Sequence, residues 1–237
     1  KRKREDRKMT YSHIRSGYFL SRPNRFIAWV EIDGRKEKCH VKNTGRCKEL
    51  LTDRALVYMQ ESDNPARKTR YDVIAVQKGE LLINMDAQAP NRAAEEWLKR
   101  GGLLPHPTQV KAEAKYGQSR LDFYLENAQR RMFVEVKGVT LEEHGVAKFP
   151  DAPTQRGIKH IQELCRCVED GYEATLLFVV QMKGMYCVTP NWDTHPEFGQ
   201  ALQEAQRKGV QILAIDCTVT PDSITISREV PFVWSYS

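Results

Sequence analysis

The pattern of apolar residues along this chain changes at about Pro90, and this change restricts the fold more than any other feature. Residues 17–87 read as short runs rich in Val, Ile and aromatic residues, separated by turn signals such as Asp33-Gly34 and Lys78-Gly79. After Pro90, runs with helical spacing alternate with strand-like runs. We therefore expect two units, a small β-domain and an α/β domain, with a boundary between residues 86 and 90.

The first part is expected to form a small β-barrel. Its strands are expected at residues 26–32, 36–41, 55–61, 71–77 and 80–85. Short strands separated by turns and combined with an excess of basic residues are typical of the oligonucleotide-binding (OB) fold, which is the leading candidate. Other small barrels share this pattern, so the strand pattern alone does not choose between them.

The second part is expected to be an α/β (α+β) domain around a mixed sheet. The run 174–182 is apolar at nearly every position, as expected for a central strand buried on both faces. Gly101-Gly102 and Gly209 are suitable helix stops, and Pro153 suits a helix start. The expected helices are 91–100, 153–170 and 196–208, and the expected strands are 109–116, 120–126, 131–141, 174–182, 186–190 and 210–219.

The net charge of +6 is distributed unevenly along the chain. Residues 1–8 carry +4, residues 9–85 carry +5 and residues 86–237 carry −3. Such an asymmetry favours nucleic-acid binding by the basic part. For residues 1–8 a solvated charge run is an equally good interpretation, whereas the excess in residues 9–85 lies within expected folded structure.

The cysteine pattern and the absence of long apolar runs restrict the compartment. Six cysteines are scattered without a CxxC pair, so we expect reduced structural thiols and a cytoplasmic protein without a zinc site. No apolar run approaches the roughly 20 residues that span a bilayer, so no membrane partner is expected. We also find no phosphate-binding glycine loop, and His106 and His195 lack the spacing of metal ligands.

A carboxylate–carboxylate–lysine set lies on two neighbouring expected strands. Because side chains alternate along a strand, Glu135 and Lys137 point the same way, about 7 Å apart by strand rise. If the strands form a hairpin, Asp122 converges with Glu135, and two carboxylates suit Mg²⁺ or Mn²⁺. A neighbouring ammonium can orient water or stabilise charge on a phosphate. An ordinary salt-bridge cluster is the simpler alternative.

Basic residues elsewhere extend this interpretation. Arg156 and His160 share a face of the expected helix 153–170, where Arg156 can clamp a phosphate and His160 can assist proton transfer. A solvent-facing helix with ordinary charges is the alternative.

Basic and aromatic residues near the loops of the expected barrel suit single-strand binding. Phe26 and Trp29, taken one by one, are more simply expected in the barrel core. The candidate nucleic-acid-binding residues are Arg25, Lys42, Asn43, Arg46 and Lys48 in the barrel, and Arg120 on the Asp122 strand.

Several longer motifs resemble the sugar fermentation stimulation protein family. They cover essentially the whole chain after about residue 15 and are SRLDFYL (119–125), FVEVKGVTL (133–141), FPDAPTQRGIKHIQEL (149–164), AKYG (114–117), NTG (43–45), NR (91–92) and AQRKGVQILA (205–214). The resemblance implies an N-terminal OB-type barrel followed by a restriction-endonuclease-like domain of the PD-(D/E)xK class. It also implies non-specific DNA binding and a regulatory role in sugar, particularly maltose, metabolism.

The resemblance also implies roles for individual residues. Asp122 and Glu135 match the metal-binding acidic residues of the nuclease class, and Lys137 matches the lysine of its E-x-K element. Leu121 stands where a proline usually precedes the aspartate, which departs from the broad nuclease pattern. The class often adds a glutamate from the first helix, for which Glu96 matches better than Glu95.

Together these observations predict a basic tail at residues 1–9, an OB-like barrel at 10–87 and a nuclease-like domain at 88–237. The expected function is binding of nucleic acid, single-stranded or duplex DNA or RNA, with Mg²⁺- or Mn²⁺-dependent hydrolysis of phosphodiesters. A non-catalytic DNA-binding regulator and an RNA-binding accessory protein are the alternatives. Both a monomer and a homo-oligomer are compatible with the sequence.

Overall fold

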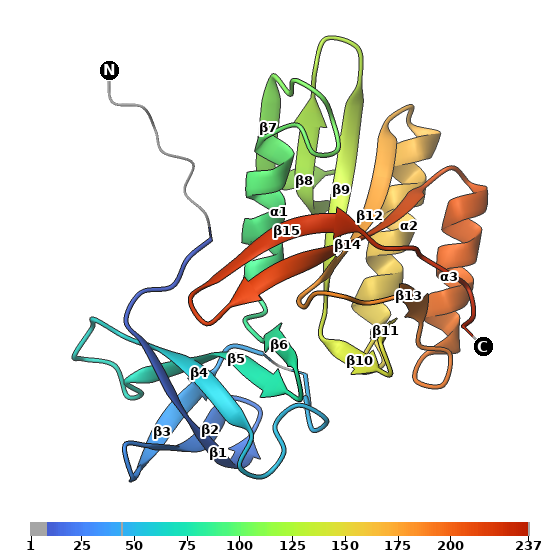
Figure 1. Cartoon of the computed structure of the whole chain (residues 1–237). Helices are drawn as coiled ribbons and strands as arrows, with labels where there is room; N and C mark the ends of the chain where they lie inside the picture. Colours follow the sequence, from blue (N-terminus) through green and yellow to red (C-terminus); the bar gives the residue numbers. More distant parts are fainter. Residues whose placement is uncertain (1–8, 44, 237) are drawn as a thin grey trace, which may run out of the picture.

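A computed structural model describes residues 9–43 and 45–236 of the chain, and Figure 1 shows it. The blue-to-cyan barrel lies below the larger domain, which is coloured from green to red. The basic run at residues 1–8 lies outside the described residues. No helix within the described ranges is long and apolar enough to cross a membrane.

The first domain is a closed β-barrel, as expected. Its sheet has the order β3-β2-β1-β4-β5-β6, and a parallel pairing of β3 with β5 closes the first five strands on themselves. This is the OB-type arrangement. The strands are β1 (Ile14–Asn24), β2 (Ile27–Ile32), β3 (Arg35–Val41), β4 (Leu56–Glu61), β5 (Tyr71–Lys78) and β6 (Leu81–Asn84).

The barrel strands differ from the expected set in one respect. The five expected strands correspond to β2–β6, whereas the barrel is closed by β1–β5, and β6 extends the sheet from β5. The first strand was missed because most of its side chains are polar and only Gly17 and Phe19 are buried. Register shifts after Phe19 interrupt its alternation, so it lacks the period-two pattern that marks a strand.

The second domain has a six-stranded mixed sheet of order β15-β14-β12-β9-β8-β7, in which β9, β12 and β14 run parallel. A smaller sheet joins β10, β11 and β13. The elements of this domain are α1 (Ala89–Lys99), β7 (Gln109–Tyr116), β8 (Ser119–Glu126), β9 (Arg131–Val139), β10 (Leu141–Glu143), β11 (Val146–Phe149), α2 (Gln155–Glu169), β12 (Glu173–Val180), β13 (Cys187–Pro190), α3 (Pro196–Arg207), β14 (Gln211–Thr220) and β15 (Ser223–Glu229).

The centre of the large sheet is buried on both faces. Every residue of β12 except Glu173 is buried, as expected for a central strand. Leu98 of α1 belongs to the same core cluster as Val134 and Leu177, whereas Leu164 of α2 belongs to the cluster that holds Phe133. The helices thus cover opposite faces. The strands β10, β11 and β15 were not expected from the sequence.

Each of the six cysteines is a buried free thiol.

Helix α2 starts at a cap that fixes the position of its first turns. Thr154 is the N-cap residue, and its side chain accepts a 2.9 Å hydrogen bond from the Gly157 amide. His195, which is buried, accepts a 3.3 Å hydrogen bond from the Thr154 amide through Nδ1. The ring of the buried His195 thus contacts the start of α2.

The two domains are joined by buried polar contacts. The Gln181 side chain, just after β12, donates hydrogen bonds of 3.1 and 3.0 Å to the carbonyl and side chain of Asn84, the last residue of β6. The Lys78 ammonium lies 2.6 Å from the Glu142 carboxylate of β10. Before the barrel, Met9 is buried and Thr10 pairs with Ser223 of β15. These contacts join the barrel and the segment before it to the residues after β12 and to β10 and β15.

Candidate metal centre and basic groove

Asp122 and Glu135 come together where β8 and β9 separate. The antiparallel ladder, the hairpin expected from the sequence, extends to the pair Phe123 and Val134. Beyond this pair, the Asp122 carboxylate accepts a 2.7 Å hydrogen bond from the Val136 amide. Asn91 of α1 donates a 2.8 Å hydrogen bond to the other oxygen of Asp122. The carboxylate is thus held between a helix and a strand.

Glu135 is the most buried member of the site, with 2% of its surface exposed. Its Oε1 atom accepts hydrogen bonds from Lys137 Nζ, at 2.6 Å, and from Nδ1 of His160. Arg156 Nε donates to the other ring nitrogen of His160 at 3.4 Å, and Lys137 Nζ lies 3.4 Å from Nδ1. The Oε2 atom of Glu135 is buried and has no hydrogen-bond partner among the described residues.

The two carboxyl groups differ in acidity. Burial and the nearby charge of Glu135 raise the pKa of Asp122 to about 6, against the hydrogen bonds from Val136 and Asn91. Burial also opposes ionisation of Glu135, but the His160 hydrogen bond and the Lys137 charge outweigh it and lower the pKa of this group. At neutral pH the negative charges of Asp122 and Glu135 therefore lie close together in a largely buried position, and Oε2 of Glu135 has no hydrogen-bond partner among the described residues.

This arrangement fits a hard divalent cation. A cation would neutralise the repulsion between Asp122 and Glu135 and would give the orphaned Oε2 atom a partner. Within residues 9–43 and 45–236, no group of three or more His, Cys, Asp or Glu side chains is arranged to hold a metal. Two carboxylates suffice for Mg²⁺, which commonly keeps several water ligands and uses substrate phosphates.

The first helix contributes an amide to the site. Asn91, in the NR motif, reaches Asp122, whereas Glu95 and Glu96 lie beside Lys99 and Arg100 at 2.5 and 3.5 Å. Sequence reasoning missed Asn91 because the nuclease pattern directs attention to a glutamate. A metal-ligand role for Glu96 remains a prediction.

The candidate nucleic-acid-binding residues of the barrel fall into two groups. Lys42 lies 3.3 Å from the Asp72 carboxylate, and the Asn43 side chain donates to the Met85 carbonyl at 3.1 Å. Both therefore have intramolecular partners. Arg25, Arg46 and Lys48 instead line a groove of about 410 Å³ and are exposed. Arg120 is exposed on β8, two residues before Asp122.

The groove, called the basic groove below, depends on an arginine that sequence reasoning missed. Arg22 of β1 donates hydrogen bonds of 2.6 to 2.7 Å to three carbonyls, those of Arg25, Asn43 and Arg46. These bonds fix the loop before β2 and the loop after β3. The described lining residues include no acidic side chain and are Arg22, Asn24, Arg25, Gly45, Arg46, Lys48, Leu51 and Ala152.

An exposed aromatic residue follows Arg25. Phe26 was expected in the barrel core, but 51% of its surface is exposed, which corrects that expectation. The physical reason is its place in the turn between β1 and β2, where the Asn24 side chain accepts a 2.9 Å hydrogen bond from the Phe26 amide. Trp29 is half-buried, with the Lys36 ammonium 4.8 Å from its ring centroid.

Comparison with known families agrees with this two-domain architecture. Residues 20–85 match the model described as the SfsA N-terminal OB domain, and residues 88–223 match the model described as the sugar fermentation stimulation protein RE domain. The chain belongs to the sugar fermentation stimulation protein family. The family resemblance predicted from the sequence motifs is thereby confirmed.

Two relatives and one solved structure are similar to this chain over nearly its full length. A sugar fermentation stimulation protein homolog of Clostridium beijerinckii is 55% identical over 218 residues, which cover 92% of this chain and 96% of the relative. A homolog of Desulfitobacterium hafniense is 58% identical over 216 residues, which cover 91% of this chain and 94% of the relative. The structure of Pyrococcus furiosus SfsA in complex with Ca²⁺ has a TM-score of 0.86 and 29% identity, covering 96% of this chain and 99% of that chain.

Proposed function

We propose that this member of the sugar fermentation stimulation protein family is a nucleic-acid-binding, divalent-metal-dependent nuclease. The observation that carries the proposal is the buried, unpartnered Oε2 atom of Glu135 beside Asp122, whose pKa is raised to about 6. Unpartnered buried carboxylate oxygens are costly unless a ligand satisfies them. The Pyrococcus furiosus relative is a complex with Ca²⁺, which, like Mg²⁺, prefers oxygen ligands, and this supports the class of metal.

In this proposal Asp122 and Glu135 hold Mg²⁺ or Mn²⁺. The metal would stabilise charge on the phosphodiester and lower the pKa of a bound water. Lys137, whose Nζ donates a 2.6 Å hydrogen bond to Glu135, positions the attacking water or donates to a phosphate oxygen. His160 orients Glu135 through its Nδ1 proton, and the exposed Arg156 guanidinium binds phosphate.

The basic groove and Phe26 provide the proposed nucleic-acid contacts of the barrel. Arg25, Arg46 and Lys48 neutralise backbone phosphates, and Phe26 stacks on a base. Lys42 and Asn43 support the groove through their intramolecular bonds. Arg120, exposed near Asp122, contacts phosphate on the nuclease side. DNA is the expected partner, with RNA as the other nucleic acid to be tested.

A second candidate function is a non-catalytic DNA-binding regulator of sugar metabolism. The family description, sugar fermentation stimulation protein, favours this alternative. It uses the same basic groove but leaves the metal centre without a catalytic role. A fold can host several functions, so the two candidates are separated by activity and not by architecture.

The decisive experiment compares cleavage and binding by wild type and Lys137→Ala. Single- and double-stranded DNA and RNA are incubated with Mg²⁺, Mn²⁺ or EDTA. We expect metal-dependent cleavage by wild type, a loss of about 100-fold in Lys137→Ala, and unchanged binding in EDTA. Lys208→Ala, at the exposed end of α3, is the control and should cleave normally. Equal cleavage by Lys137→Ala would exclude the proposed site, and binding without cleavage by wild type would favour the regulator.

A further inference from the structure

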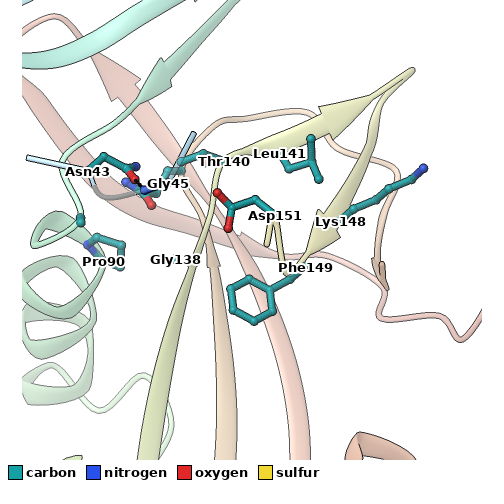
Figure 2. Close-up of a pocket in the computed structure, with 11 residues that line it drawn as sticks. Asn43, Gly45, Pro90, Gly138, Thr140, Leu141, Lys148, Phe149 and Asp151 are labelled. Carbon is teal, nitrogen blue, oxygen red and sulfur yellow. Dashed lines mark hydrogen bonds between the residues drawn. The ribbon is translucent and has the colours of Figure 1, made fainter. Parts of the chain in front are cut away.

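A second cavity lies between the barrel and the larger domain, at the carboxyl ends of the parallel strands β9 and β12 (Figure 2). This interdomain pocket has a volume of about 180 Å³. Ligands of α/β proteins commonly bind outside the carboxyl ends of parallel strands, where loops converge. Here the pocket is formed by the loop after β3, the start of α1, the end of β9 and the loop before α2.

The interdomain pocket adjoins the candidate metal centre. Gly138 lines the pocket and directly follows Lys137 in β9, where successive residues rise by about 3.3 Å. Pro90, which also lines it, precedes Asn91, whose side chain bonds Asp122. On both β9 and α1, a residue of the pocket is therefore next in sequence to a residue of the metal centre.

The interdomain pocket also adjoins the basic groove. Gly45 lines both cavities, and the consecutive residues Asp151 and Ala152 line the pocket and the groove, respectively. A Cβ atom on Gly45 would clash with Asp151 Oδ2, so Gly45 and the Asp151 carboxylate lie in close contact at the boundary between the cavities. The basic groove, the pocket and the metal centre thus follow one another across the domain interface.

The lining of the pocket suits a nucleoside better than a phosphate. Figure 2 shows the Asp151 carboxylate pointing into the cavity. Lys148 points away from it, and its ammonium lies 2.5 Å from the Glu143 carboxylate. A carboxylate repels phosphate but accepts hydrogen bonds from a base amino group or a ribose hydroxyl. The volume is below the roughly 300 Å³ at which pockets for drug-sized ligands begin, so it holds one nucleoside at most.

We propose that the interdomain pocket is a nucleoside-binding subsite, which receives one nucleotide of a single strand that runs from the basic groove to the metal centre. This inference rests on the nucleic-acid binding proposed above and specifies its substrate class. A base-paired nucleotide cannot enter such a recess without being unpaired and unstacked, which costs a few kcal/mol. Single strands, or duplexes with a single-stranded end, are therefore preferred over blunt duplexes.

The test is a binding measurement in EDTA, so that cleavage does not contribute. Fluorescence anisotropy is recorded for wild type with labelled 12-nucleotide DNA and RNA strands and with blunt 12-base-pair duplexes. We expect at least tenfold tighter binding of the single strands. Asp151→Ala and the closer-shaped Asp151→Asn should lose about tenfold in single-strand affinity, with duplex affinity unchanged. Asp193→Ala removes an exposed carboxylate elsewhere and serves as the matched control.

The outcomes separate this inference from the proposed nuclease activity. Equal affinity of wild type for single strands and blunt duplexes overturns the subsite. Asp151 variants that bind single strands as tightly as wild type, or that lose the same affinity for single strands and for duplexes, also overturn it. An Asp151-dependent preference for single strands supports it, even when no metal produces cleavage. Cleavage without that preference supports the nuclease and rejects the subsite. A stronger effect with RNA than with DNA identifies the ribose 2′-hydroxyl as the Asp151 partner.

Discussion

Asn91 of helix α1 donates a 2.8 Å hydrogen bond to Asp122 of strand β8, and the backbone of Val136 binds the other carboxylate oxygen. The position of one proposed metal ligand therefore depends on three elements, α1, β8 and β9. Hydrogen bonds to a metal-binding side chain orient it and tune its affinity for the metal.

Replacing Asn91 with Ala should raise the pKa of Asp122 above about 6, because the Asn91 hydrogen bond favours the charged form. Protons then compete more strongly with metal. We expect about fivefold weaker Mn²⁺ binding near pH 6 and a smaller loss at pH 8, measured by titration calorimetry. Asn64→Ala, in a barrel turn, should leave the Mn²⁺ affinity unchanged at both pH values. A loss of affinity that is the same at both pH values would contradict this account.

Divalent cations should stabilise the wild-type protein through Asp122 and Glu135. A ligand at 100 times its Kd adds about 2.7 kcal/mol, which raises Tm by roughly 5–10 °C for a chain of this size. Glu135→Gln should abolish the shift produced by Mg²⁺, Mn²⁺ or Ca²⁺ in thermal denaturation. The control is Glu163→Gln. Glu163 is also buried, but it lies on α2 and pairs with Arg166, so this variant should retain the shift. A full shift in Glu135→Gln would place the cation elsewhere.

The barrel should lose stability in acid through Asp72. Burial opposes ionisation of Asp72, but hydrogen bonds from Arg67 and His40 and the Lys42 charge prevail and lower the pKa to about 2. A lowered pKa contributes stability above the unfolded value of about 4, and this contribution disappears as pH falls towards 2. Asp72→Asn should cost about 2 kcal/mol at pH 7.

The check is denaturant unfolding of wild type and Asp72→Asn between pH 2 and pH 7. The difference between their free energies of unfolding should shrink as the pH falls from about 4 to 2. Asp63→Asn, an exposed carboxylate beside His13, is the control and should show no comparable change. A difference that stays constant over this range would refute the linkage. Asp122 acts in the opposite sense, since its raised pKa disfavours the charged form in the metal-free fold.

Thr154→Ala should destabilise the start of α2, which carries Arg156 and His160. Loss of the cap to the Gly157 amide costs about 1 kcal/mol and lowers Tm by a few degrees. Thr154→Ser keeps the hydroxyl and should restore most of the stability. Calorimetric Tm values of the three proteins test this, and equal values for wild type and Thr154→Ala would exclude a capping role.

Local pattern was sufficient for most elements and for part of the site. Alternation along a strand predicted that Glu135 and Lys137 point the same way, and their 2.6 Å contact agrees. Periodicity and glycine stops located α1, and the apolar run located β12. These features depend on residues close in sequence, so the chain itself carries the information. By contrast, β1 was missed, because it pairs with both β2 and β4 while burying few side chains.

The sequence by itself determined two domains, the family motifs and the residue types of the proposed metal centre. Tertiary structure decided that an amide from Asn91 holds Asp122, that Oε2 of Glu135 is left unpartnered, and that Phe26 faces solvent. It also decided that Gly45 and Asp151 meet between the basic groove and the proposed metal centre. Such contacts join residues far apart along the chain. Their geometry depends on how the barrel packs against the sheet, which no local pattern specifies.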